Sequence, residues 1–191
     1  MDLFLQIVGG LSALLNKIFL SQAEGRKNEK IWRLLGWWAS LIGVPAWTII
    51  FALKHDWMAA AVDFGATPSI ILGLVIAHKG LDHSYKKLEK FAKVFTYFLL
   101  SVSIAYSLYD FGGITSLSQF LEIGLVAGFL IGSYLLAKKK RSGWLWFFLM
   151  NVSTAILTAT QGKYIFAAQQ VISLYFVVRG FLKAKSETKT T

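Results

Sequence analysis

Residues 117–141 read LSQFLEIGLVAGFLIGSYLLAKKKR, and this stretch decides the fold. Its first 21 residues contain a single charged side chain, Glu122, and four basic residues then follow without a break. An α-helix needs about 20 mostly apolar residues to cross the hydrocarbon core of a bilayer, which is about 30 Å thick. We therefore predict a transmembrane helix over residues 117–137 that ends in a basic loop.

The whole chain has the composition of an integral membrane protein. Hydrophobic residues make up 55% of its 191 residues, charged residues make up 16%, and the mean hydropathy is +0.55. A soluble domain of this size could not cover so much apolar surface with so few charges. The chain has no cysteine, which excludes disulfides and thiol nucleophiles, and its three histidines do not suggest a metal site. No cofactor is predicted.

Seven segments have the length and apolar character of membrane spans. Pro68 falls inside the third segment, where a missing N–H and a bulky ring favour a break in the helix. The N-terminal MDLFLQIVGG lacks the basic residues of a cleavable signal, so the first segment is predicted to be a helix of the mature protein. The segments cover approximately 3–20, 32–53, 58–78, 91–109, 117–137, 144–161 and 163–182.

The positive charges predict the orientation. Of the 20 Lys and Arg residues, only Lys54 and Lys163 fall on one side of these spans. By the positive-inside rule the other side is cytoplasmic, so the N-terminus is predicted outside and the C-terminus inside. The net charge of +10 is thereby explained as a topology signal, and no nucleic-acid partner is expected. The basic side holds Lys17, Arg26, Lys27, Lys30, Arg33, Lys79, Lys86, Lys87, Lys90, Lys93, Lys138, Lys139, Lys140, Arg141, Arg179, Lys183, Lys185 and Lys189.

The chain matches itself without gaps at an offset of 107 residues. Trp37 falls on Trp144, and Gly73 falls on Gly180. The same offset superimposes the second and third spans on the sixth and seventh, including the hairpin between them. The sequence therefore predicts an internal duplication of three helices.

This duplication predicts two parallel three-helix bundles joined by a linking helix. The first bundle covers 1–78, a basic cytoplasmic loop and the linking helix cover 79–116, and the second bundle with a basic tail covers 117–191. Parallel repeats of this kind are a known transporter plan, with the substrate held between the halves near mid-membrane. A structural membrane protein could also arise by duplication, and that alternative stays open.

Five polar side chains are expected at depth within the spans. A polar group in hydrocarbon is costly, so Asp63, Glu122 and Asn151 are candidates for a functional site. Gln169 and Gln170 are adjacent and point in different directions, so only one of them is expected to face the centre. Each residue also has a structural interpretation. Asn151 could hydrogen-bond a neighbouring helix, Asp63 could support the proline break, and Glu122 could pair with a lysine near the outer face.

Aromatic side chains share a helical face with one of these polar groups. Trp144 and Phe147 are three residues apart, and Asn151 continues the same face four residues later. Two rings and an amide on one stripe suit a flat heteroaromatic ligand, which the rings would stack and the amide would orient. Trp47 lies deeper than most of the other tryptophans, which cluster near span ends as interfacial anchors do.

Several features of residues 119–181 occur together in one family of transporters. An acidic residue opens the fifth span, YLLAKKK precedes a tryptophan, and an asparagine follows that tryptophan by seven residues. A short GKY hairpin and a glycine near the end of the seventh span complete the pattern. With these features, residues 119–181 resemble the C-terminal half of PnuC-type vitamin transporters, and the N-terminal half resembles the first bundle of that family more loosely.

The resemblance implies a fold, a substrate class and a location. Such families have a three-plus-one-plus-three fold related to SWEET proteins and transport nicotinamide riboside, with relatives that move thiamine, riboflavin or nucleosides. They are facilitators of the bacterial inner membrane whose substrate is trapped by phosphorylation in the cytosol. Their W-x-x-W pair falls on Trp144 and Phe147, where phenylalanine replaces the second tryptophan, and their polar position falls on Asn151.

The sequence therefore predicts an all-α carrier for a small vitamin or nucleoside rather than an enzyme. No nucleophile–base pair or HExxH-type motif is visible. The expected partners are the small-molecule substrate and the lipid bilayer, and assembly into a homo-oligomer stays open. Two other functions also stay open, which are a proton-coupled transporter that uses Asp63 or Glu122, and a receptor that transports nothing.

Overall fold

The computed structural model describes residues 2–25, 28–53, 55, 57–80, 85–113 and 116–184, and this part of the chain is helical with short turns. The predicted all-α fold is confirmed. The helices are α1 (Asp2–Ala23), α2 (Glu29–Leu53), α3 (Trp57–Gly65), α4 (Thr67–Lys79), α5 (Lys86–Phe111), α6 (Leu117–Ala137), α7 (Ser142–Thr160) and α8 (Tyr164–Lys183).

The described residues form seven segments long and apolar enough to cross a membrane, as predicted. The third segment, Trp57–Lys79, consists of α3 and α4, which are separated at Ala66. Pro68 follows this break and has no N–H to donate, while its ring excludes the carbonyl four residues earlier. The amide of Ala66 bonds the carbonyl of Asp63 at 3.2 Å, which tightens the end of α3. The predicted irregularity of this span is therefore present.

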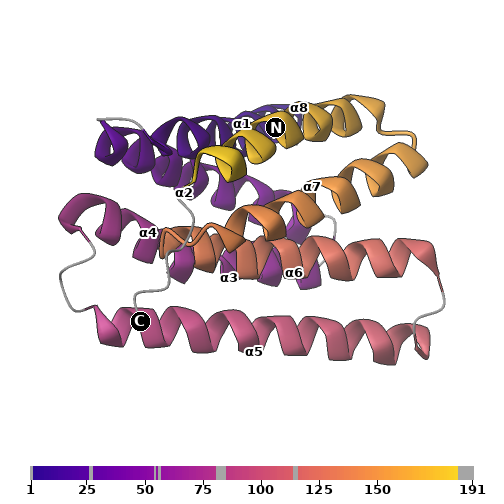
Figure 1. The fold of residues 1–191 in the computed structure, drawn as a ribbon. Coiled ribbons are helices and arrows are strands. Elements are labelled where there is room, and N and C mark those ends of the chain that lie inside the picture. The colour runs from indigo at the N-terminus through magenta and orange to yellow at the C-terminus, as the bar shows by residue number, and fades with distance from the viewer. Residues whose placement is uncertain are drawn as a thin grey trace.

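The helices lie roughly along one axis (Figure 1). Their contacts connect six of the seven spans into a closed ring. Around the ring, α1 packs on α2, α2 on α3 and α4, α4 on α6, α6 on α7, α7 on α8, and α8 on α1. The remaining helix, α5, lies outside the ring and packs against α3, α4 and α6. A linking helix would occupy such a position, while the division of the ring into two bundles stays a prediction.

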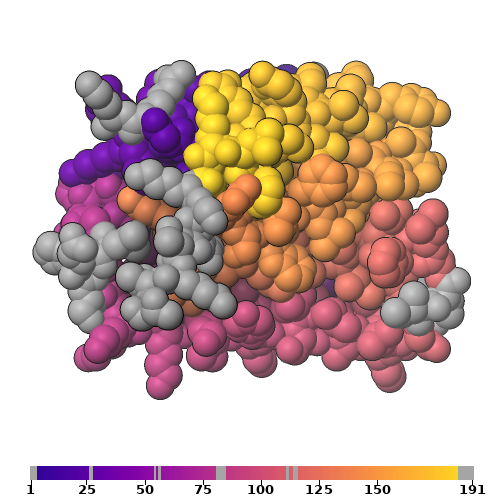
Figure 2. All heavy atoms as spheres, viewed as in Figure 1, coloured from indigo at the N-terminus to yellow at the C-terminus, as the bar shows by residue number. Residues whose placement is uncertain are grey.

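Large apolar side chains cover the outside of the described helices. They are especially prominent on α5 and α8, as at Phe98, Ile165 and Leu182. Figure 2 shows one face of the molecule, on which α8, α7, α6 and α5 follow one another with side chains filling the spaces between the ribbons. An apolar surface of this extent fits contact with lipid.

The two halves of the sequence repeat share a packing contact. Trp37 and Trp144 are each 1% exposed. Trp37 lies against Gly73 so closely that a Cβ atom on the glycine would approach the indole to under 3.0 Å, and Trp144 lies against Gly180 in the same way. The offset of 107 residues relates the first pair to the second, so the repeat extends from sequence to structure at this contact.

Part of the basic segment between the third and fourth spans is helical, although the sequence predicted a loop. Residues 79–93 were expected to form a cytoplasmic loop, but α5 begins at Lys86 and carries four of its lysines on its first turns. Lysine, glutamate and leucine are good helix formers, which extends the helix beyond its apolar part. Five charges of the topology prediction lie outside the described residues, namely Arg26, Lys27, Lys54, Lys185 and Lys189.

Candidate functional site

The predicted stripe on α7 is buried inside the helix ring. Trp144, Phe147 and Asn151 are 1%, 3% and 0% exposed. The rings of Trp144 and Phe147 lie edge to face, with centroids 6.4 Å apart and planes at 87°. Their spacing of three and four residues places all three side chains on one face, as predicted. The stripe therefore faces protein rather than the membrane interface.

The amide of Asn151 is only half satisfied within the described structure. Its Nδ2 atom donates to the carbonyl oxygen of Phe147 at 2.6 Å, one turn earlier on the same helix. Its Oδ1 atom is buried and has no hydrogen-bond partner among the described residues. An unpaired buried acceptor costs about 1–3 kcal/mol. A donor on a bound solute would recover this free energy, so Asn151 combines a fixed orientation with an available acceptor.

Neighbouring glycines bring other helices onto the two rings. A Cβ atom at Gly180 of α8 would lie 2.6 Å from Cζ2 of Trp144, and one at Gly132 of α6 would lie 2.5 Å from Cδ1 of Phe147. Backbone can approach this closely only where no side chain intervenes. The aromatic pair is thus enclosed by α6 and α8 as well as by its own helix.

Trp47 and Gln169 belong to a second group, where α1, α2 and α8 meet. Gln169 Nε2 donates to the carbonyl oxygen of Gly10 at 2.6 Å, which connects α8 with α1. The Trp47 ring lies 5.7 Å from that of Phe51 and 6.1 Å from that of Phe166. Of the two adjacent glutamines, Gln169 is therefore bonded to α1. Gln170 carries a buried Oε1 atom with no partner among the described residues.

The two predicted acidic residues lie apart from the α7 stripe. The Thr48 hydroxyl of α2 donates to Asp63 Oδ2 at 3.0 Å, and Asp63 is half-buried. Glu122 is exposed on α6. Lys163, in the turn before α8, donates to Gln161 Oε1 at 2.9 Å. The eight predicted site residues are thus distributed over several places, and the aromatic–amide stripe is the group with a common face.

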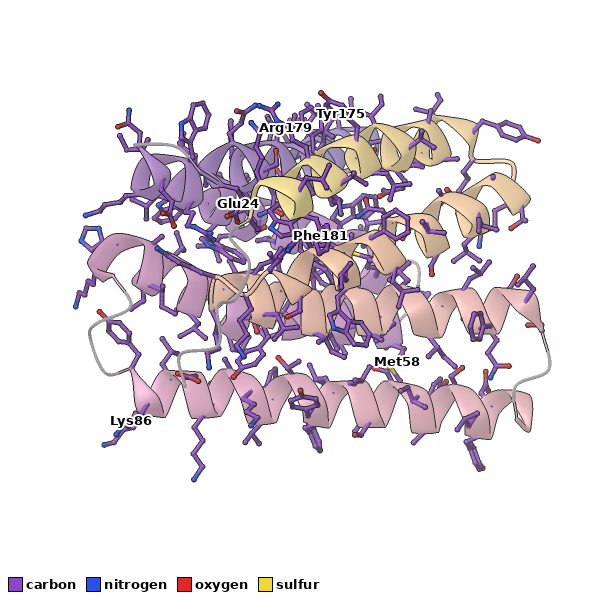
Figure 3. The ribbon with its side chains drawn as sticks, viewed as in Figure 1. Glu24, Met58, Lys86, Tyr175, Arg179 and Phe181 are labelled. Carbon is purple, nitrogen blue, oxygen red and sulfur yellow. The ribbon has the colours of Figure 1, made fainter. Side chains whose placement is uncertain are left out.

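A half-buried carboxylate that could not be identified from the sequence connects three helices. Glu24 lies just after α1 (Figure 3), and its side chain is 11% exposed. Its Oε1 atom accepts from Arg33 Nη2 of α2 at 2.9 Å and from Trp144 Nε1 of α7 at 3.3 Å. Burial raises the pKa of Glu24 above its usual value, and the charge of Arg33 opposes this effect.

Two further ion pairs extend this contact. Glu29 accepts from Arg33 at 2.8 Å and from Lys139 at 2.8 Å, and Lys139 belongs to the turn between α6 and α7. We call Glu24, Glu29, Arg33 and Lys139 the polar closure, because together they fasten α1, α2 and the start of α7 at one end of the molecule. This is the end for which the charge distribution predicts a cytoplasmic location.

Other contacts secure the same end. Lys138 bonds Glu89 of α5, and this bond raises the pKa of Lys138. The guanidinium of Arg141 lies 4.1 Å from the ring centroid of Phe181 and donates to the Phe181 carbonyl at 3.1 Å. Arg179 donates to Gln22 at 3.2 Å. These contacts connect the turn after α6 with α5 and α8, and α8 with α1.

A sequence signal for the polar closure does exist. Arg33 follows Ile31 and Trp32 and precedes a long apolar run, so a charge with no buried partner would be costly there. Charges of α1 and α2 were interpreted only as topology signals, yet Arg33 and Lys17 are buried within their helices. Two acidic residues within reach, Glu24 and Glu29, identify the partners of Arg33 once burial is considered.

No protein-family model, curated protein or solved structure matches this chain. The function proposed for it rests on the contacts of its own side chains and on the family resemblance of residues 119–181.

Proposed function

We propose that this protein transports a small ring-containing solute of the vitamin or nucleoside class, similar to nicotinamide riboside, across the bacterial inner membrane. Seven apolar helices are compatible with a membrane transporter. The resemblance of residues 119–181 to PnuC-type transporters supports the substrate class. The repeated tryptophan–glycine contact supports a molecule built from two related halves.

The observation that carries the proposal is the buried acceptor of Asn151 beside an aromatic pair. Trp144 and Phe147 offer ring faces and edges, which attract a flat heteroaromatic group. Asn151 Oδ1 offers an acceptor that the described residues leave unpaired. A nucleoside or vitamin ring with N–H groups on its edge matches both features. Gln170, with its own buried acceptor, is the second candidate for a polar contact.

The polar closure supports transport by alternating access. Trp144 connects the aromatic pair with the polar closure, because its ring faces Phe147 while its N–H donates to Glu24. A solute that displaces the Trp144 ring would strain the bond to Glu24, and this would couple binding to opening at the cytoplasmic end. Movement of the two halves about the bound solute would then release it inside. We propose facilitated diffusion, with phosphorylation in the cytosol trapping the solute.

Asn151→Leu tests this proposal and Thr154→Val is its matched control. Thr154 lies on the same helix, and its hydroxyl bonds its own backbone at Met150 with a distance of 2.7 Å. Each substitution removes one polar group and keeps the number and branching of the side-chain heavy atoms. Thermal unfolding and tryptophan quenching of the purified protein would be measured with nicotinamide riboside, thiamine, riboflavin and a panel of nucleosides.

We expect one solute to raise the unfolding temperature of the wild type and of Thr154→Val in a saturable way. Asn151→Leu should lose about 1.5–3 kcal/mol of binding free energy, about tenfold or more in Kd, while its own stability stays the same or rises. Equal binding by both variants would refute a ligand role for Asn151. Loss of stability in Asn151→Leu without any change in binding would identify the residue as a packing amide.

A further inference from the structure

A cavity of about 420 Å³ lies at the end of the molecule that holds the polar closure. It is bordered by the first turns of α2, the last turn of α4 and the turn after α6. The polar side chains around it are Glu29, Lys30, Arg33, His78, Lys79 and Lys139. Its volume lies within the range of small-molecule sites in proteins.

The cavity is strongly positive. Four cationic side chains face one carboxylate, which leaves a net charge of +3 when His78 is neutral. Glu29 neutralises part of this charge through its ion pairs with Arg33 and Lys139, and Glu24 neutralises a further part through its ion pair with Arg33. Lys30 and Lys79 make no ion pair among the described residues, and both are exposed. Two ammonium groups at the rim therefore have their full donor capacity available.

The backbone on the α2 side of the cavity favours an anion. The N-terminal turn of α2, which contributes Glu29, Lys30 and Arg33, carries the positive end of a helix of 25 residues. The opposing α4 ends here, and the Gly80 amide caps its Ile76 carbonyl at 2.9 Å. This bond satisfies one of the carbonyl groups that would otherwise repel an anion.

We propose that this cavity binds a phosphate group, either on a soluble phosphate compound or in the headgroup of an anionic phospholipid. Lys30 and Lys79 would donate to the phosphate oxygens at the rim. Bonds between such cations and phosphate are among the stronger hydrogen bonds in proteins. The site lies at the polar closure rather than at the α7 stripe, so its occupancy is independent of the identity of the transported solute.

The alternative is that these lysines only determine the membrane topology, and it makes a different prediction. If Lys30 and Lys79 serve only the topology of the chain, they should bind an anion no better than other lysines at this end. Lys86 and Lys90 are such lysines. They lie on the first turns of α5, they do not line the cavity, and Figure 3 shows Lys86 extending away from the molecule.

The test compares Lys30→Gln/Lys79→Gln with Lys86→Gln/Lys90→Gln, each of which removes two positive charges from exposed positions. Protein purified in uncharged detergent would be titrated by calorimetry with inorganic pyrophosphate and with dihexanoyl phosphatidylglycerol. Dihexanoyl phosphatidylcholine, whose headgroup has no net charge, serves as the lipid control. Thermal unfolding without ligand checks that both variants remain folded.

We expect saturable one-to-one binding of at least one of the two anions. Lys30→Gln/Lys79→Gln should raise its Kd by about tenfold or more, while Lys86→Gln/Lys90→Gln should change it by less than about threefold. Binding of pyrophosphate alone would identify a soluble phosphate compound as the ligand, and binding of phosphatidylglycerol alone would identify a lipid headgroup. The proposal is wrong if neither anion binds saturably, or if both double variants weaken binding equally.

Discussion

At the scale of single residues, Glu24 holds more of the structure together than its place in a short loop suggests. It supplies the acceptor for a buried guanidinium and for a buried indole N–H. Glu24→Ala removes this acceptor from both groups. It should lower the free energy of unfolding by about 1–3 kcal/mol, because the indole N–H loses its partner while Arg33 keeps its pair with Glu29. Glu24→Gln keeps an oxygen in the same place and should change it by no more than about 1 kcal/mol at pH 7. Thermal or denaturant unfolding in one detergent would measure both changes.

The pH dependence of Glu24 provides a second measurement on the same variant. Because burial raises the pKa of Glu24, the folded protein holds this proton more tightly than the unfolded chain does. The cost of burying the charge is fully present above the folded pKa, and it disappears as pH falls toward the unfolded value of 4.5. As pH falls from 7 to 4, the free energy of unfolding of the wild type should therefore rise relative to that of Glu24→Gln. A stability difference that does not change with pH would contradict this assignment.

The residues of the candidate site could be predicted where one helix sets their positions. Trp144, Phe147 and Asn151 share a face because of helical spacing, and the structure confirms this face. The bond between Gln169 and Gly10 joins residues 159 positions apart, and spacing along one helix contains no information about it. The same limit applies to Glu24, whose contact with Trp144 depends on how α1 meets α7.

At the scale of helices, the glycine positions determine how closely the elements pack. Gly73→Ala and Gly180→Ala would each push a Cβ atom into a buried indole. Each should lower the free energy of unfolding by about 1–3 kcal/mol, offset in part by the gain of about 1 kcal/mol that alanine has over glycine in a helix. Unfolding measurements on both variants test whether the repeated contact is equivalent in the two halves.

Gly10→Ala is the control for these two variants. Its nearest neighbour is the flexible end of Gln169, at 3.2 Å from the added Cβ atom. A small shift of that side chain relieves the contact, so the change in unfolding free energy should stay below about 1 kcal/mol. If Gly10→Ala were as harmful as Gly180→Ala, loss of glycine itself would be responsible rather than the contact with the indole.

The helices themselves could be predicted from the sequence because hydropathy and proline act locally. All seven spans are present among the described residues, and the break before Pro68 follows from the chemistry of proline. The start of α5 was missed because charge was treated as a loop signal, although Lys86 and its neighbours favour a helix. Helix boundaries at charged ends depend on propensity and on capping bonds such as Glu89 to Tyr85, which hydropathy does not describe.

At the scale of the whole molecule, the end that is rich in positive charge is also the end where the polar contacts between helices are concentrated. The polar closure, the cation–ring contact of Arg141 and the cavity proposed to bind phosphate all lie at the end rich in lysine and arginine. The opposite end contains the turn between α7 and α8, with Gln161 exposed. A carrier that traps its solute by phosphorylation needs its closure and release at the cytoplasmic end. The orientation predicted by the charges is therefore also the orientation that the proposed mechanism requires.

Single cysteines can test this orientation directly, since the natural chain contains none. We expect a cysteine at Gln161 to react with a membrane-impermeant maleimide in intact cells. A cysteine at Lys140, which is also exposed but lies in the turn after α6, should react only after the membrane is permeabilised. Each position is the control for the other, because both lie in turns directly after a span. If only Lys140→Cys were labelled in intact cells, the topology would be the reverse of the predicted one. The polar closure would then lie outside, and release and trapping in the cytosol would have no structural basis.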